Sequence, residues 1–118
     1  MKQFLAIYTG TPSSLERSKW NSMDEAKRKE TERAGIAAWG AWMKKHEKSV
    51  VVAGGPLGKT KRIAPDGITD IKNNMAGYVV VQAESHQAAA QMFLDHPHFT
   101  IFPGDSVEIM ECLPIPGQ

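Results

Sequence analysis

Residues 96–105 read HPHFTIFPGD and place two histidines, an aromatic cluster and an aspartate in one short stretch. His96 and His98 are two positions apart, so in an extended chain both side chains point to the same side. A neutral imidazole titrates close to physiological pH and can act there as a general base. We therefore predict that His98 and His96 are catalytic, and that Asp70 or Asp105 orients the base.

A structural interpretation of the same residues stays open. His96 would end a helix, where the helix dipole already explains it, and His98 would hydrogen-bond within a turn. This makes His98 the stronger catalytic candidate. A metal site would need His96 and His98 with Asp70 or Asp105, but no spacing in the chain matches a metal-binding signature, so we predict no metal and no organic cofactor.

Two tryptophans and two cations are the candidates for substrate binding. Trp39 and Trp42 would form an aromatic wall suited to a flat organic substrate, although packing is an alternative for both. The stretch GGPLGKTKR at 54–62 lacks the spacing of a phosphate-binding loop. Arg62, and Lys72 further along, are predicted to draw a carboxylate towards a nearby cleft.

The first half of the chain predicts a strand, a loop and a long helix. QFLAIYTG (3–10) is a short apolar run closed by glycine, typical of a strand. Residues 11–22 are polar and irregular and are predicted to form a connecting loop. Ser22 and Glu25 have the spacing of a capping box, which predicts a helix from Met23 to about Lys48.

The second half predicts strands and one more helix. Residues 49–58 are predicted to form a buried strand, and strand pieces flank a tight turn at the sequence PDG (65–67). GYVVVQAE (77–84) is the clearest strand. Ser85 would cap a helix over 86–96 that Pro97 stops, and SVEIMECLP (106–114) is the last strand.

This order of elements is typical of an α+β protein with the ferredoxin-like βαββαβ plan, an antiparallel sheet with both helices on one face. The other face of the sheet would then need cover. A second copy of the chain would supply it, so we predict a homodimer, perhaps with the two sheets face to face.

Length and composition narrow the function. The 118 residues fit a single domain (1–118), and 14 basic against 13 acidic side chains give a net charge of +1, which argues against a nucleic-acid partner. No segment has the length of a membrane span, and the first residues do not resemble a signal peptide, so we predict a cytoplasmic protein that does not bind membranes. The single cysteine, Cys112, excludes an intrachain disulfide.

Several ordered motifs resemble the YCII-related (DGPF-domain) family. They are AGGPLG (53–58), PDG (65–67), ITDIKNNMAGYVVV (68–81), SHQAAAQMF (85–93) and HPHF (96–99). The resemblance implies a YCII-like dimeric ferredoxin-like α/β barrel. It also implies lyase or isomerase chemistry on small cyclic or aromatic acids, with a His–Asp pair as the proposed catalytic core.

The chain departs from the family pattern at that pair. The aspartate of the family's "DPF" motif falls on His96, and His98 is inserted before Phe99. The family's first-helix histidine falls near Ala38 and Trp39, so the His–Asp pair is absent as such.

Two functions follow as expectations. The first is a cofactor-independent lyase or isomerase, in which His98 assists proton transfer on a small aromatic or lactone acid. The alternative is a non-catalytic dimer that binds a small molecule or a protein partner.

Overall fold

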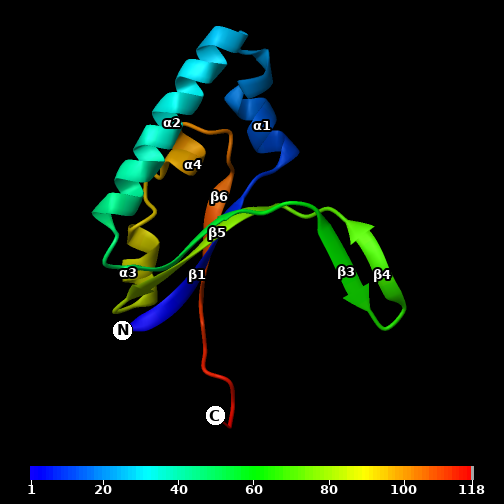
Figure 1. The fold of residues 1–118 in the computed structure, drawn as a ribbon, viewed down its shortest axis with the longest axis vertical. Helices are drawn as coiled ribbons and strands as arrows, with labels where there is room; N and C mark the ends of the chain where they lie inside the picture. Colours follow the sequence, from blue (N-terminus) through cyan, green and yellow to red (C-terminus); the bar gives the residue numbers. More distant parts are fainter. Residues whose placement is uncertain (118) are drawn as a thin grey trace.

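A four-stranded antiparallel sheet forms the body of the protein, which the computed structural model describes over residues 1–117 (Figure 1). The strands are β1 (Lys2–Thr9), β2 (Val50–Pro56), β5 (Met75–Ala83) and β6 (Ser106–Glu111), in the order β2-β5-β1-β6. Helices α2 (Glu25–Lys45) and α3 (His86–Gln91) lie on the same side of the sheet. This arrangement confirms the ferredoxin-like fold.

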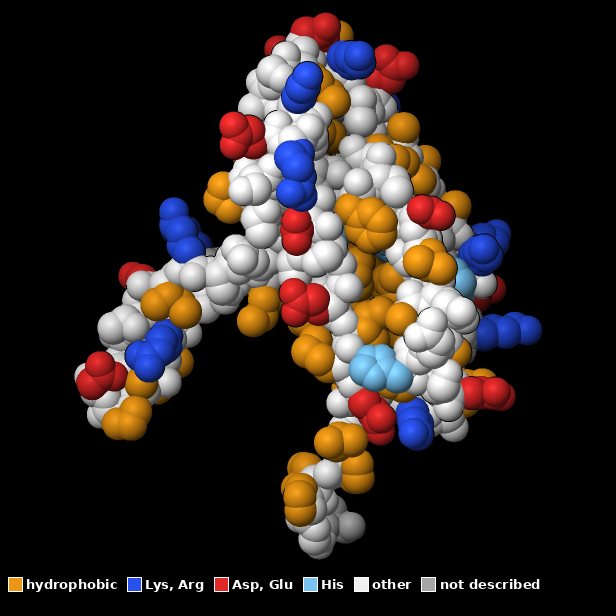
Figure 2. Space-filling model, turned by 180° about the vertical axis from the view of Figure 1, so that it is seen from behind, with side chains coloured by type: hydrophobic (Ala, Val, Ile, Leu, Met, Phe, Trp, Pro, Cys, Tyr) orange, Lys and Arg blue, Asp and Glu red, His pale blue; other side chains and the backbone are white. Residues whose placement is uncertain are grey.

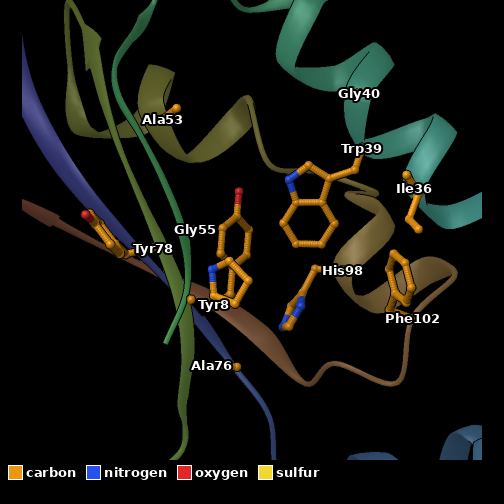
Figure 3. Close-up of a pocket in the computed structure, with 12 residues that line it drawn as sticks. Tyr8, Ile36, Trp39, Gly40, Ala53, Gly55, Ala76, Tyr78, His98 and Phe102 are labelled. Atoms are coloured by element: carbon orange, nitrogen blue, oxygen red, sulfur yellow. The ribbon is translucent and has the colours of Figure 1, made fainter. Parts of the chain in front are cut away.

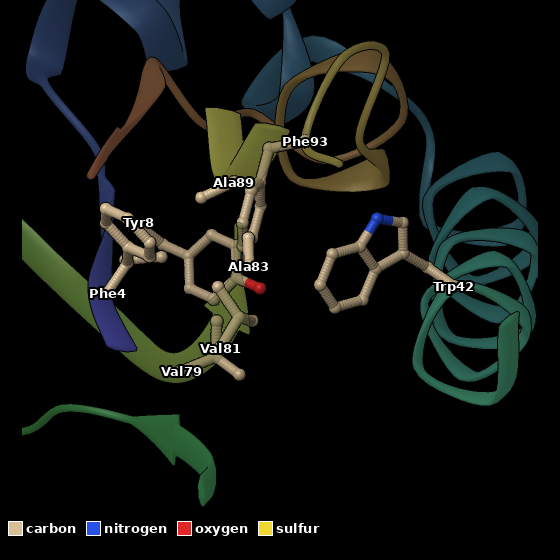
Figure 4. Packing of buried hydrophobic residues seen from close by; sticks show 9 residues of the cluster. Phe4, Tyr8, Trp42, Val79, Val81, Ala83, Ala89 and Phe93 are labelled. Atoms are coloured by element: carbon tan, nitrogen blue, oxygen red, sulfur yellow. The ribbon is translucent and has the colours of Figure 1, made fainter. Parts of the chain in front are cut away.

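The hydrophobic core lies between the sheet and these helices (Figure 4). Phe4, Ala6 and Tyr8 alternate along β1 towards the helices, as the two-residue period of a strand requires, and all three are buried. On β5 the matching residues are Val79, Val81 and Ala83, while Trp42, Ala89 and Phe93 complete the core from the helical layer.

The opposite face of the sheet carries an apolar row that no element covers. Leu5 lies opposite both Val80 and Met110, and Val80 lies opposite Val52, so these four residues cross the sheet side by side. Val52 and Met110 are 45% and 43% exposed, whereas Phe4 and Val81 on the helical face are fully buried. This surface is referred to below as the open face.

The segment after β1 is helical, so the prediction of a loop over residues 11–22 was wrong. Helix α1 (Pro12–Ser18) begins at a capping box in which Thr11 and Ser14 exchange side-chain-to-backbone hydrogen bonds. A short 3-10 helix, η1 (Trp20–Ser22), follows. Serine and threonine are common in loops, but they are also the residue types that cap helices, as Thr11 and Ser14 do here.

Helix α2 starts two residues later than predicted, and Ser22 does not cap it. Asp24 is the N-cap, and its carboxylate accepts a hydrogen bond from the amide of Lys27. Serine and aspartate are both preferred at N-caps, so the residue type alone does not separate Ser22 from Asp24. The negative charge of the Asp24 carboxylate also interacts favourably with the positive end of the helix dipole.

The predicted helix over 86–96 divides into shorter pieces. Helix α3 ends at Gln91, and a separate helix, α4 (Pro97–Thr100), begins at the proline that was expected to stop the first one. A proline is well tolerated in the first turn of a helix, because its missing amide hydrogen would have no partner there. His96 is therefore the N-cap of α4, and the prediction that it ends a helix was wrong.

Strand β2 lies at the edge of the sheet, and most of its residues are exposed, contrary to the expected burial. Its pairing with β5 shifts between Val52 and Gly55. Gly54 has a φ of 63°, and a side chain there would collide with the backbone carbonyl of Tyr78. Gly54 therefore allows the bulge in the pairing of β2 with β5.

Strands β3 (Thr60–Ala64) and β4 (Gly67–Ile71) form a hairpin, referred to below as the arm, which projects away from the body (Figure 1). The arm exposes Ile63 and Ile68, which lie opposite each other and are 73% and 69% exposed. Figure 2 shows the arm standing clear of the body, with hydrophobic and charged side chains on its surface.

Among the helices of residues 1–117, none combines the length and the hydrophobicity needed to span a membrane.

Candidate functional site

A cavity of about 460 Å³ opens between α2 and the sheet, beside the end of β2 (Figure 3). Its volume is in the range of small-molecule sites. Among residues 1–117, no lysine, arginine, aspartate or glutamate lines it. The lining residues are Tyr8, Ile36, Trp39, Gly40, Ala53, Gly55, Pro56, Ala76, Gly77, Tyr78, His98 and Phe102.

His98 enters this wall from helix α4, and the main chain of β1 fixes its ring. Its Nε2 lies 2.7 Å from the carbonyl oxygen of Thr9. A carbonyl only accepts, so Nε2 carries the hydrogen and, in the neutral ring, Nδ1 carries the lone pair.

Nδ1 of His98 is the nitrogen that a bound molecule can meet. It has no hydrogen-bond partner within residues 1–117. The only buried side-chain nitrogen or oxygen there without a partner is Nε of Arg28, so Nδ1 is not closed off from open space. The His98 side chain is otherwise buried, and it reaches open space at the wall of the cavity.

The surroundings of His98 keep it neutral at physiological pH. Burial lowers its pKa below the usual value, and the hydrogen bond to Thr9 and the negative charge of Asp105 offset part of that effect. A neutral imidazole with a free lone pair is the form that accepts a proton.

His96 is fully buried and holds the backbone of His98 through a hydrogen bond. Its Nδ1 accepts a hydrogen bond from the backbone amide of His98 at 2.9 Å, so its Nε2 carries the hydrogen and donates to the Tyr8 hydroxyl at 3.4 Å. Burial, and then the nearby His98 and His46, lower the pKa of His96 to about 4. His96 therefore holds α4 and Tyr8 in place, away from the cavity wall.

Tyr8 joins the core to the cavity. Its ring centroid lies 4.8 Å from that of Trp39 and 5.2 Å from that of His98. Burial raises the pKa of Tyr8 far above its usual value, so the phenol keeps its proton. Because its oxygen accepts from His96, its own hydrogen remains available for another acceptor.

Gly104 makes room for the His98 ring. A side chain at this position would overlap the imidazole and the carbonyl oxygen of His98, and the amide of Gly104 donates to that same carbonyl at 2.9 Å. The turn alone does not account for a glycine at position 104, because the close approach of the His98 imidazole also leaves no room for a side chain there.

Asp105 lies next to this turn but does not hydrogen-bond to His98. Its carboxylate pairs with Arg17 at 3.1 Å, and its amide donates to the same Thr9 carbonyl that holds the imidazole. The orienting acceptor is therefore a backbone oxygen, while Asp105 acts on His98 through its charge.

The other predicted polar residues lie on or beside the arm, and none lines the cavity. Asp70 pairs with Lys61 at 2.7 Å, and Arg62 lies within 4.0 Å of Asp66. Lys72 follows the end of β4 and is exposed. Within one chain the structure does not bring Asp70, Arg62 or Lys72 together with His98.

The two tryptophans separate into different roles. Trp39 lines the cavity, with its ring centroid 6.0 Å from that of His98. Trp42 is buried in the core, and its Nε1 donates to the carbonyl of Met92 at 2.8 Å. The packing alternative therefore describes Trp42, and the predicted wall consists of Trp39 with other residues.

Sequence reasoning missed most of those residues. Tyr8 lies on the same face of β1 as the buried Phe4 and Ala6, and the two-residue period of a strand is the signal that could have placed it there. Ile36 and Phe102 meet the cavity because α2 and the chain after α4 pack closely at Gly35. No sequence pattern indicated this close contact between α2 and the chain after α4.

Within the part of the chain that the structure describes, no three histidine, cysteine, aspartate or glutamate side chains gather as a metal site would require.

Comparison with solved structures gives a likeness in fold. No model of a protein family matches the chain, and no curated protein matches it in sequence. Among solved structures, the chain is similar to 5-chloro-2-hydroxyhydroquinone dehydrochlorinase (TftG) from Burkholderia phenoliruptrix, in complex with 2,5-dihydroxybenzoquinone. The TM-score is 0.53 at 16% sequence identity, over 92% of this chain and 90% of that chain. This likeness agrees with the ferredoxin-like fold.

Proposed function

We propose that the protein is a cofactor-independent lyase or isomerase in which His98 accepts a proton from a small, flat ring compound. The observation that carries the proposal is the state of the His98 ring. Its Nε2 is tied to the Thr9 carbonyl, while Nδ1 is left without a partner at an apolar cavity. A base fixed in one tautomer and one orientation is already arranged for proton transfer.

The lining of the cavity favours a ring without a permanent charge. Trp39, Tyr8 and Phe102 offer aromatic surfaces, and no lysine or arginine among residues 1–117 reaches the wall. A carboxylate buried there would lack a counter-charge, which is costly. Phenols, enols and lactones therefore fit better than the free acids that the sequence suggested.

Two likenesses support this proposal. The motifs quoted above suggest membership of the YCII-related family, and the dehydrochlorinase of similar fold holds a dihydroxybenzoquinone, which is a flat oxygenated ring. Both likenesses point to small cyclic compounds.

The variant His98→Gln tests the proposal. The glutamine amide can still donate to the Thr9 carbonyl but cannot accept a proton at neutral pH. Turnover of a panel of small phenols, enols and lactones should fall by about 100-fold or more. The control is His86→Gln, because His86 is exposed, lies outside the cavity and bonds to the carbonyl of Ile109. Undiminished turnover in the folded His98→Gln protein would exclude His98 as the base.

A second candidate function is binding without catalysis. The hydrogen-bonded series from His98 through His96 to Tyr8 is also what a rigid binding site needs. In that case the cavity would bind members of the panel, no product would form, and His98→Gln would only weaken their affinity.

We also propose that the protein works as a homodimer. The open face presents an uncovered apolar row, and the arm exposes two isoleucines. A two-stranded hairpin on its own is at best marginally stable in water, so the arm needs a surface to pack against. A second copy placed on the open face would cover both features.

A further inference from the structure

The two tryptophans of α2 differ in one respect that bears on ligand recognition. The indole Nε1–H of Trp42 is satisfied inside the protein by the Met92 carbonyl. That of Trp39 has no acceptor within residues 1–117, and it is not a closed-off buried atom. An indole nitrogen can only donate, so Trp39 brings an unused donor to the cavity.

The polar groups of the cavity lie at two different ends. In Figure 3 the indole nitrogen of Trp39 lies towards Ala53, whereas the imidazole of His98 lies towards Ala76. The Tyr8 hydroxyl belongs to neither end, because it is turned into the core, where it accepts from the fully buried His96 (Figure 4). One end of the cavity therefore offers a donor, and the other offers an acceptor on a base.

This arrangement selects a chemical class of ligand. An oxygen acceptor is needed opposite Trp39, and an acidic hydrogen is needed opposite Nδ1 of His98. The acceptor must be uncharged in the free ligand, because the wall has no cation to offset a carboxylate.

We infer that Trp39 is a specificity-determining residue whose indole N–H binds a ligand carbonyl oxygen, and that the ligand is a planar ring with a conjugated carbonyl and an ionisable hydroxyl. This inference rests on the proposed function and names the substrate class of the same site.

The proton transfer balances without any co-reactant. The O–H bond of the ligand breaks, the proton goes to Nδ1 of His98, and the electron pair stays on the ligand. Conjugation carries the new negative charge to the carbonyl oxygen. There the Trp39 Nε1–H stabilises it, in the way that a donor placed where charge develops favours a reaction.

Four matched para-substituted benzenes test the inference by direct binding measurements at neutral pH. 4-Hydroxyacetophenone has both groups, 4-ethylphenol lacks the carbonyl, 4-methoxyacetophenone lacks the acidic hydrogen, and 4-hydroxybenzoate carries a carboxylate. We expect 4-hydroxyacetophenone to bind about three- to tenfold more tightly than 4-ethylphenol, which is the usual contribution of one hydrogen bond. 4-Hydroxybenzoate should bind most weakly.

The variant Trp39→Phe keeps an aromatic surface and removes only the donor. It should lose the preference for 4-hydroxyacetophenone over 4-ethylphenol while binding 4-ethylphenol within about twofold of the original protein. The matched control is Trp42→Phe, which removes an indole from the same helix away from the cavity and should keep the preference.

The possible failures can be told apart. If the preference survives in Trp39→Phe, or if the original protein does not distinguish the two phenols, the role of Trp39 is wrong while the proposed function stands. If none of the four compounds binds, the proposed function and this inference are both overturned.

Discussion

Nε2 of His98 lies 2.7 Å from the carbonyl oxygen of Thr9, so the candidate base is oriented by the main chain of the first strand. In many sites of this kind a carboxylate orients the histidine. Here the acceptor is a backbone atom at the end of β1, and the same carbonyl also accepts from the amide of Asp105. The position of the base therefore depends on the sheet more than on any one side chain.

The titration of His98 should respond to Asp105. Burial lowers the pKa of His98, and the charge of Asp105 offsets part of that effect, so Asp105→Asn should lower the pKa further. NMR titration of the histidine ring protons measures this directly. Asp66→Asn, in the exposed turn of the arm, is the control and should leave His98 unchanged. An unaltered His98 titration in Asp105→Asn would contradict the electrostatic role of Asp105.

Stability should decline in mild acid because of His96. Its pKa in the folded protein is about 4, against 6.5 for a free histidine, so below pH 6.5 the unfolded chain takes up a proton that the folded one refuses. The free energy of unfolding should fall as the pH drops from about 6.5 to 4, by up to ~3 kcal/mol, with His98 adding in the same direction.

Urea unfolding at pH 7.5 and at pH 4.5 measures the difference. His96→Gln should be less stable at pH 7.5 but should show a smaller loss between the two pH values. The exposed His86→Gln should keep the full loss. A stability of the original protein that does not change over this range would show that His96 is readily protonated in the folded state.

Gly104→Ala should disturb the site without touching a ligand. The added methyl group would overlap the His98 ring, so the ring or the turn must shift. We expect a loss of about 1–3 kcal/mol in stability, typical of overpacking, and weaker binding of phenol probes. Gly58→Ala is the control, because a methyl group there would meet open space. Unchanged binding by Gly104→Ala would mean that the position of His98 does not matter.

Two glycines of α2 should respond to the same substitution in opposite ways. A methyl group at Gly35 would meet the ring of Phe102, whereas one at Gly40 has nothing within 4 Å. Gly35→Ala should lower stability by about 1–3 kcal/mol, and Gly40→Ala should raise it by about 0.5–1 kcal/mol, since alanine is the better helix former. Thermal or urea unfolding of both variants tests the close approach of α2 to the chain after α4. Equal effects would argue against it.

A charge placed on the open face should separate the proposed dimer. Val80 lies in the centre of the apolar row, so Val80→Lys should give a folded monomer. Sedimentation equilibrium would then report the chain mass of 13.0 kDa, against twice that mass for the original protein. Gln87→Lys, on the exposed surface of α3, should remain dimeric. A monomeric original protein would refute the dimer.

The fold could be predicted because its strands carry strong local patterns. The short apolar run in 3–10 and the stretch 77–84, rich in β-branched residues, both form central strands of the sheet. The errors came where one residue type has two uses. Pro97 starts helix α4, although a proline can also stop a helix, and Ser22, which was expected to cap α2, lies in η1.

The candidate site was only half predictable, since it depends on contacts between distant segments. His98 and Trp39 were chosen for their chemistry, and both line the cavity. Tyr8 and Phe102 meet them only after β1, α2 and α4 pack together. The orienting group could not be found at all, because a backbone carbonyl has no signature in the sequence. Asp70 and Arg62 were chosen for their charge, and pairing on the arm accounts for both.

The arm is an insertion within a hairpin, because β2 pairs directly with β5, and Pro56 already lies opposite Gly77. A short turn in place of residues 57–74 would leave every strand of the sheet in place. The loop-closure cost of a longer or shorter connection changes only slowly with its length. Residues 57–74 are therefore where this fold can gain or lose sequence most freely, so the surface offered to a partner can evolve separately from the cavity.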